Sequence, residues 1–332
     1  MNQHVDAAQQ HITDWVNEMG LLTTEKAWQK FHKAKFAYLA ARAFPDAGLH
    51  ELCLIADFNT WLFILDDKCD EAAEGRKASR AMTRPLMSPI TAPMAMTAAM
   101  AGSIMAGLLD ILQHNIVYLP AGGHPLAAAL SSIWERMRLL SDPHWRLGFI
   151  KTVSDYFTAC IWEAENREAG IIPSLEDYTK MRPFTGALLA DIEAIEIIEK
   201  ITLPQAVKDQ ALLQRMIQAC NNLVCWTNDV FSCLKESKQG DVHNLVLVLQ
   251  HANKCSLQEA INEAYIMLKE EVAIFVTLEK LLPLTGSEAD YELIRFVAVL
   301  HAWIVGNADW STKDTGRYTV VPSTAPAHSA LH

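Results

Sequence analysis

Basic residues are scarce in this 332-residue sequence, which holds 28 Lys and Arg against 39 Asp and Glu and has a net charge of −11. No basic run occurs, which argues against a nucleic-acid partner. The seven cysteines form no C-x-x-C pair, so we expect reduced core residues rather than a disulfide framework. The first residues also lack a basic segment followed by an apolar run. We therefore expect a cytoplasmic protein without a signal peptide.

Two other patterns are missing. No stretch alternates apolar and polar residues between turn pairs, so no strand is predicted. No linker rich in Pro, Gly or Ser divides the chain, so we expect one domain over residues 1–320 and a disordered tail over 321–332. Residues 85–109 are uncharged and long enough to span a membrane, but three prolines and many small residues favour a buried helix from about Ala92. We therefore expect no membrane partner.

What the sequence does contain is helical periodicity over most of its length. The predicted class is all-α, with a mobile polar loop at 71–81. The expected helices cover residues 6–18, 24–42, 47–65, 92–114, 124–141, 143–168, 174–182, 186–199, 204–236, 243–252, 256–282 and 288–311.

The most informative polar pattern lies within residues 220–244. Asn228, Ser232 and Glu236 are spaced four apart, so they stack on one face of a helix. Their amide, hydroxyl and carboxylate oxygens suit Mg²⁺ better than zinc or copper. A solvated polar face is the alternative, but the flanking residues are mostly apolar, and buried polar groups need partners. A Mg²⁺ site that can hold an anion such as diphosphate is therefore predicted, with Lys235 as a nearby cation.

A second acidic cluster, Asp66, Asp67 and Asp70, follows an apolar helix that we expect to end there. Asp66 and Asp70 lie one turn apart on one face. Three neighbouring carboxylates repel one another, and acids are unfavourable at a helix C-terminus. A bound multivalent cation would offset both costs, whereas the alternative is a solvated acidic turn.

The two motifs together, D-D-x-x-D early and N-D-x-x-S-x-x-K-E late, resemble those of the class I terpene synthases, specifically the bacterial type with a single α domain. The resemblance extends over residues 5–320. Arg182 resembles the diphosphate-sensing arginine of the family. Arg317 and Tyr318, preceded by Trp310, resemble its C-terminal Arg-Tyr pair.

This resemblance implies an antiparallel helical bundle around a deep apolar pocket. It also implies three Mg²⁺ ions, two of them held by Asp66 and Asp70 and one by Asn228, Ser232 and Glu236. The implied diphosphate donors are Arg182, Lys235, Arg317 and Tyr318, while Asp67 pairs with Arg317 on closure.

The segment from Arg182 to Gly186 is predicted to be a broken helix, because Pro183 disfavours helix at the preceding residue and glycine permits a bend. By the resemblance, Thr185 links the sensor Arg182 to Gly186, whose carbonyl promotes ionisation. The commoner linker is an aspartate, so Thr185 departs from the pattern. Among the aromatic residues that could face the pocket, Phe63 and Trp310 are preferred over Phe157, Phe184 and Trp226.

The implied activity is that of a carbon–oxygen lyase, which would ionise and cyclise an isoprenyl diphosphate. Farnesyl diphosphate is the favoured substrate and geranylgeranyl diphosphate the alternative; a homodimer is compatible with the family. An elongating prenyltransferase would need a second D-D-x-x-D. A di-iron bundle would need E-x-x-H pairs, which are absent from the sequence. A non-catalytic helical binding protein is the remaining alternative, although Arg182, Lys235 and Arg317 are all retained.

Overall fold

Every regular element in the part of the chain that the structure describes is a helix. This computed structural model describes residues 1–81, 98–120, 124–284 and 286–318, with side chains except those of 70–81 and 288. The predicted all-α class is thereby confirmed. The helices are α1 (Val5–Glu18), α2 (Glu25–Ala34), α3 (Phe36–Ala43), α4 (Leu49–Ala81), α5 (Ala98–His114), α6 (Pro125–Leu140), α7 (Pro143–Ala169), α8 (Leu175–Thr185), α9 (Leu188–Glu199), α10 (Gln205–Lys208), α11 (Ala211–Gln239), α12 (Leu245–Asn253), α13 (Leu257–Lys280), α14 (Glu288–Asp309) and the π-helical turn η1 (Trp310–Asp314).

Local sequence signals explain several of the helix boundaries. The side chain of Asp142 accepts hydrogen bonds from two backbone N–H groups of the first turn of α7, and Pro143 occupies the first helical position. The same helix ends at Gly170, which has a left-handed backbone conformation (φ 69°). Ser256 and Glu259 form a reciprocal capping box at the start of α13.

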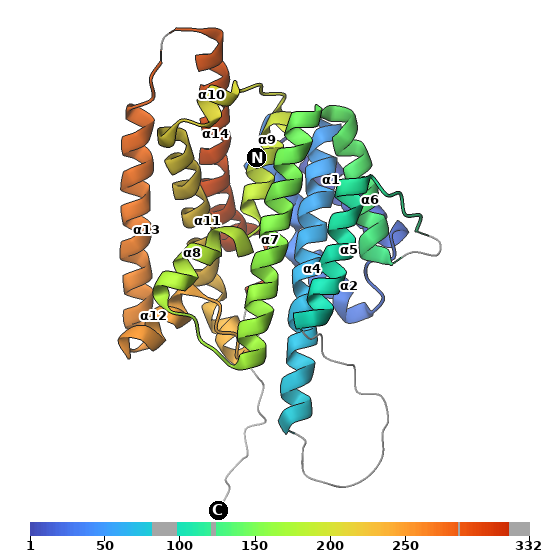
Figure 1. Ribbon diagram of the computed structural model, residues 1–332, viewed down its shortest axis with the longest axis vertical. Coiled ribbons are helices and arrows are strands. Elements are labelled where there is room, and N and C mark those ends of the chain that lie inside the picture. Colours follow the sequence, from blue (N-terminus) through green and yellow to red (C-terminus); the bar gives the residue numbers. More distant parts are fainter. Residues whose placement is uncertain (82–97, 121–123, 285, 319–332) are drawn as a thin grey trace, which may run out of the picture.

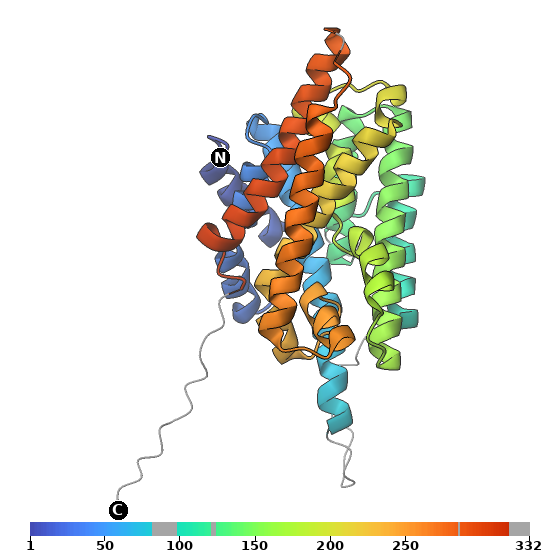
Figure 2. The ribbon, with the colours of Figure 1, turned by 90° about the vertical axis from the view of Figure 1, so that its left-hand side faces the viewer.

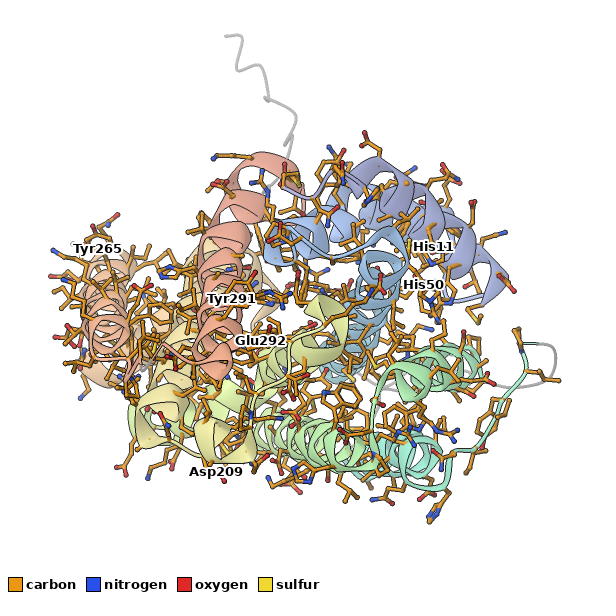
Figure 3. All side chains as sticks on the ribbon, turned by 90° about the horizontal axis from the view of Figure 1, so that it is seen from above. His11, His50, Asp209, Tyr265, Tyr291 and Glu292 are labelled. Carbon is orange, nitrogen blue, oxygen red and sulfur yellow. The ribbon has the colours of Figure 1, made fainter. Side chains whose placement is uncertain are left out.

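The long helices lie side by side along the long axis of the molecule, as Figures 1 and 2 show. Helix α4 packs against α1, α3, α6 and α9, while α11 packs against α13, α14 and α12. Helix α7 connects these groups through its contacts with α5, α8 and α9. Seen from above, the helices surround an interior filled by side chains, and Tyr265 of α13 lies at the outer edge (Figure 3).

The interior is mostly apolar and rich in aromatic rings. Trp61 is fully buried and donates a hydrogen bond from Nε1 to the carbonyl of Leu126 at 3.0 Å. Phe149 stacks on Trp134 and Trp145. A smaller cluster, which includes Tyr178 and Trp226, fills the space between α8, α11, α12 and α13. This packing makes the helices a rigid frame for the polar groups described below.

Several sequence-based boundaries were wrong. The helix expected at 24–42 is divided at Lys35, which adopts a left-handed conformation (φ 51°) between α2 and α3. The helix expected at 204–236 is divided at 209–210 and continues to Gln239. The helix expected at 47–65 continues to Ala81, so residues 71–81 are helical rather than a loop. Their Ala, Glu, Lys and Arg residues are strong helix formers, which the prediction underweighted.

The extension of α4 also removes one argument about the acidic cluster. Asp66 and Asp67 lie within the helix rather than at its end, so the macrodipole argument does not apply to them.

Within the described residues, no helix is long and apolar enough to cross a membrane. Residues 92–97 of the expected helix and the expected tail at 321–332 lie outside the described residues.

Candidate active site

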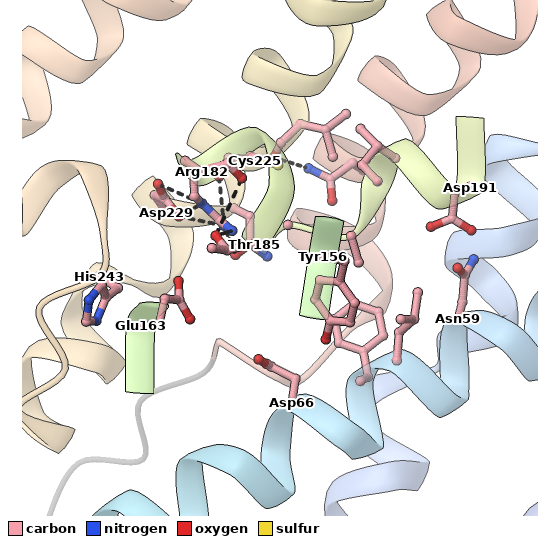
Figure 4. Close-up of a pocket in the computed structure, with 18 of the residues that line it drawn as sticks. Asn59, Asp66, Tyr156, Glu163, Arg182, Thr185, Asp191, Cys225, Asp229 and His243 are labelled. Atoms are coloured by element: carbon pink, nitrogen blue, oxygen red, sulfur yellow. Dashed lines mark hydrogen bonds and ion pairs between the residues drawn. The ribbon is translucent and has the colours of Figure 1, made fainter. Parts of the chain in front are cut away.

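A cavity of about 160 Å³ lies between α4, α7, α8, α9, α11 and α14. Figure 4 shows that its charged groups are not evenly distributed. Asp66, Glu163, Arg182, Asp229 and His243 lie toward one end, which we call the polar end, whereas Asn59 and Asp191 face each other on the opposite side. Apolar side chains complete the wall, namely Leu39, Leu62, Phe63, Leu188, Val224 and Trp303.

Helix α11 supplies one side of the polar end. Asn228, Ser232 and Glu236 follow each other at one-turn intervals, as the sequence predicted, and Asn228 and Glu236 line the cavity. Asn244, just beyond this helix, donates hydrogen bonds from Nδ2 to the Glu236 carboxylate (2.8 Å) and to Ser232 Oγ (3.3 Å). Burial, aided by the charge of Asp229, raises the pKa of Glu236 to about 7. Asn244 therefore holds Ser232 and Glu236 toward each other. The raised pKa of Glu236 shows that its carboxylate is only partly stabilised in this site.

Arg182 reaches the cavity from α8. Its Nη2 and Nε donate to Oδ1 of Asp229 at 2.8 and 3.1 Å, and Tyr178 donates its hydroxyl hydrogen to Oδ2 at 2.6 Å. The Thr185 hydroxyl lies 3.4 Å from Nη1 of Arg182. The ionic partner of the arginine is therefore Asp229 of α11, and Nη1 is its least engaged nitrogen.

The chain break beside Arg182 is present, but its position and cause differ from the prediction. Pro183 lies inside the last turn of α8, which continues to Thr185. The residue with the left-handed conformation is Ala187 (φ 58°), not Gly186. Glycine is required at 186 because a Cβ there would overlap Sγ of Cys225. Asn221 of α11 donates to the carbonyl of Pro183 at 2.8 Å and fixes the break against that helix.

Helix α4 supplies the opposite side of the polar end. Asp66 lines the cavity with 51% of its side chain exposed, and desolvation in this concave site, together with the charges of Asp67 and Glu163, raises the pKa of its carboxyl group. Arg317 donates two hydrogen bonds to the carboxylate of Asp67, at 2.7 and 2.9 Å, so the structure contains the pair expected between these two residues. The Arg317 guanidinium also lies 5.0 Å from the ring centroid of Phe63. The side chain of Asp70 lies outside the described residues.

The C-terminal segment reaches this polar end as well. The backbone N–H of Gly316 donates to the carbonyl of Lys33 at 2.7 Å. Nδ2 of Asn228 donates to the hydroxyl oxygen of Tyr318 at 2.6 Å. Arg317 and Tyr318 thus contact both motifs, one on α4 and the other on α11.

Several residues expected at the cavity do not line it, among them Ser232, Arg317 and Tyr318, which lie beside its polar end. Trp310 is fully buried behind Phe63, with 5.7 Å between ring centroids, and donates from Nε1 to the carbonyl of Ala34. Lys235 lies outside the cavity wall. Phe157, Phe184 and Trp226 are also absent from the wall. Because helix periodicity does not say which of two stacked aromatic layers faces a cavity, sequence reasoning could not separate Phe63 from Trp310.

Several polar residues of the site were missed. Asp229 sits inside the second motif, but only the tertiary contact with Arg182 reveals its role. On α7, Glu163 pairs with Arg167 at 3.1 Å, and Arg167 reaches Asp241 at 3.3 Å. The Glu163–Arg167 spacing of four was a usable signal. The other missed residues of the wall are Asn59, Tyr156, Asp191, Asp241, His243 and Asn307.

The polar end offers several oxygen atoms that could hold a metal ion. Within the described ranges, no three acidic, His or Cys side chains gather closely enough to hold an ion alone. Asp66 and Glu236 nevertheless have raised pKa values, because desolvation in the cavity and neighbouring carboxylates disfavour their charged forms, and a cation would reverse this effect. Asn228 and Ser232 add neutral oxygens. These residues fit a hard divalent ion that takes further oxygen ligands from an anionic substrate.

Comparisons with known proteins identify the family of this chain. The family model described as "Terpene synthase family 2, C-terminal metal binding" matches residues 57–273. The chain is 34% identical to a (+)-T-muurolol synthase, described as (2E,6E)-farnesyl diphosphate cyclizing, of Roseiflexus castenholzii, over 99% of this chain and 92% of that protein. It is 30% identical to a germacrene A synthase of Nostoc punctiforme, over 93% and 89% of the two chains.

Solved structures show the same fold. A linalool/nerolidol synthase of Streptomyces clavuligerus, solved in complex with 2-fluorogeranyl diphosphate, superimposes with a TM-score of 0.79 at 22% identity. The match covers 94% of this chain and 99% of that one. An α-eudesmol synthase gives a TM-score of 0.78 at 20% identity, with coverage of 94% and 95%. The predicted helical-bundle fold and the predicted family are both confirmed, and the chain belongs to the metal-binding terpene synthase family 2.

Proposed function

We propose that the protein is a Mg²⁺-dependent sesquiterpene synthase that ionises farnesyl diphosphate, cyclises the resulting cation and releases diphosphate. The observation that carries this proposal is the polar end of the cavity. It combines oxygen ligands from α4 and α11 with the guanidinium group of Arg182, beside an apolar interior. The Arg317 guanidinium lies next to this wall, 3.7 Å from Asp66. The relatives described as farnesyl diphosphate cyclizing and germacrene A synthases support the choice of substrate and reaction.

The site residues suit the first step, cleavage of an allylic C–O bond. Negative charge then develops on the leaving diphosphate, and groups already oriented toward that charge lower the barrier. Mg²⁺, with three ions expected, would neutralise the diphosphate oxygens when held by Asp66 and Asp70 on one side and by Asn228, Ser232 and Glu236 on the other. Asp229 keeps Arg182 aimed at the cavity. The least engaged nitrogen, Nη1, is then available to donate to the leaving group.

Arg317 and Tyr318 complete the proposed diphosphate site. Arg317 spans Asp67 and the face of Phe63, so it is held in place from two directions. Tyr318 contacts Asn228, one of the proposed metal ligands. We propose that both residues donate to the diphosphate, with Lys235 contributing charge from outside the wall. The carbonyl of Gly186 and the hydroxyl of Thr185 lie at the adjacent helix break, where ionisation would occur.

The remaining wall suits the second step, in which the carbocation reacts with its own double bonds. Water would quench such a cation, so an apolar, enclosed surface is needed. Leu62, Leu188 and Val224 provide such a surface. Phe63 also offers an aromatic ring. Because Arg317 occupies one face of that ring, any stabilisation of the cation by Phe63 would use the rest of the ring. Trp310 would act through Phe63, as its packing support.

The test is incubation of the purified protein with C10, C15 and C20 isoprenyl diphosphates, with Mg²⁺ or with a chelator. Products are identified by gas chromatography with mass detection, and released diphosphate is measured enzymatically. We expect a cyclic C15 hydrocarbon or alcohol, with no turnover in chelator. Preference for the C20 substrate would instead identify a diterpene synthase. Binding of all three substrates without release of diphosphate would indicate a non-catalytic binding protein.

A second arm distinguishes cyclisation from chain elongation. Isopentenyl diphosphate is added together with the C10 and C15 substrates. Longer prenyl diphosphates would contradict the proposal and identify an elongating enzyme. Analytical ultracentrifugation of the same preparation would show whether the protein is a monomer or a homodimer.

A further inference from the structure

A buried carboxyl group, Asp191, lines the cavity away from the polar end. It comes from the first turn of α9 and is only 4% exposed. Figure 4 shows it facing Asn59 of α4, on the side of the cavity opposite Asp229 and His243. Asn59 precedes Asp66 by seven residues. At 1.5 Å per residue this places Asn59 about 10 Å further along α4 than the proposed metal ligand.

Asp191 differs in its partners from Asp57, another buried acid. Asp57, which is fully buried on the same helix as Asn59, pairs with Arg136 at 2.7 Å and with His11 at 2.9 Å. Among the described residues, no basic side chain forms an ion pair with Asp191. The side-chain amide of Asn59 faces the carboxyl group and lies 2.6 and 3.1 Å from its two oxygens.

This environment favours a neutral carboxylic acid. Burial alone raises the pKa of Asp191 well above its ordinary value. A neutral amide partner compensates a carboxylate far less than a cation does. Asp191 therefore keeps its proton to a higher pH than an ordinary aspartate, and its carboxyl group lines the cavity at a depth where the hydrocarbon part of a bound isoprenoid would lie. A buried acid with no ion pair is unfavourable for stability. Glu199 shares this property, but only Asp191 also lines the cavity.

We infer that Asp191 is a catalytic acid and base for the hydrocarbon itself, separate from the groups that hold the diphosphate. This inference rests on the proposed function. In the first step, the initial cyclic cation loses a proton to the departed diphosphate and becomes a neutral olefin. The Asp191 O–H bond then breaks and a C–H bond forms on one carbon of a double bond, which leaves a new cation and the Asp191 carboxylate.

In the last step the carboxylate removes a proton from a carbon next to the final cation. A C=C bond forms, and the acid is restored. The protons balance, because the substrate loses one to diphosphate, gains one from Asp191 and returns one to it. Asn59 is a positioning residue, because its amide lies within hydrogen-bond distance of both carboxyl oxygens and fixes the orientation of the group. It also stabilises the carboxylate while it exists.

The test is turnover of farnesyl diphosphate in D₂O, with products analysed by mass spectrometry. Carbon-bound hydrogens of the substrate do not exchange with solvent, whereas the Asp191 O–H does. We expect the wild-type product to carry one additional deuterium. Asp191→Asn should abolish that deuterium and accumulate a neutral olefin with fewer rings.

Glu199→Gln is the matched control. Glu199 is a buried carboxyl at the other end of the same helix, its pKa is raised to about 7 by burial, and it lies outside the cavity wall. This variant should keep the wild-type product and its deuterium content. A wild-type product without added deuterium, or an Asp191→Asn product identical to it, would overturn the inference while leaving the proposed function intact. Absence of turnover by the wild type would overturn both.

Discussion

Replacement of Glu236 by glutamine should make the metal-free protein more stable while nearly abolishing its activity. The carboxylate is buried beside Asp229, and its pKa is raised from 4.5 to about 7. One pH unit corresponds to about 1.36 kcal/mol, so at pH 8 the ionised side chain destabilises the metal-free fold by up to about 3 kcal/mol. Glutamine removes this charge and still accepts the hydrogen bond from Asn244.

The sign of the pH dependence follows from the raised pKa. The stability that Glu236 contributes is fully present below its unfolded-state pKa of 4.5 and is lost as pH rises through about 7. The variant should therefore match the wild type near pH 4.5. At pH 8 it should exceed the wild type by up to about 3 kcal/mol in the free energy of unfolding. Urea titrations at the two pH values, in chelator, measure this difference.

Activity should change in the opposite direction. Loss of a charged ligand should lower kcat/KM on the order of a hundredfold or more, because charge stabilisation at the leaving group is reduced. Mg²⁺ with diphosphate should also stabilise the variant less than the wild type in thermal unfolding. Equal stability of the two proteins at pH 8 would refute the burial argument. Wild-type turnover by the variant would refute the metal assignment.

Two further variants test the helix break beside Arg182. Arg182→Lys keeps the charge but loses the planar group that holds Asp229 through Nε and Nη2. Diphosphate release should fall by about 10²-fold with unchanged product ratios. Chemical denaturation should show that the free energy of unfolding falls by about 1–3 kcal/mol. Unaltered kinetics would contradict this placement. Gly186→Ala should lower the free energy of unfolding by about 1–3 kcal/mol, because its methyl group overlaps Sγ of Cys225. Adding Cys225→Ala should restore much of the melting temperature. If the double variant melts no higher than Gly186→Ala, the overlap is not the cause.

Local sequence determined the class and most of the helices. Apolar residues at helical spacing bury one face of each helix, and that pattern needs no knowledge of the neighbouring helix. The four-residue spacing of Asn228, Ser232 and Glu236 likewise fixes their common face. Caps such as Asp142 and Ser256 set boundaries through hydrogen bonds within a few residues. These features are local, so sequence reasoning could reach them.

Tertiary packing decided the partners and directions of the site residues. Asp229 became the ionic partner of Arg182, although 47 residues separate them, because α8 and α11 are brought into contact. Trp310 lies behind Phe63 rather than on the wall, a matter of which layer of the core each ring occupies. Asp191 lies beside Asn59 only because α4 and α9 pack together. Contacts between helices distant in sequence leave no local periodicity, so only the folded structure shows them.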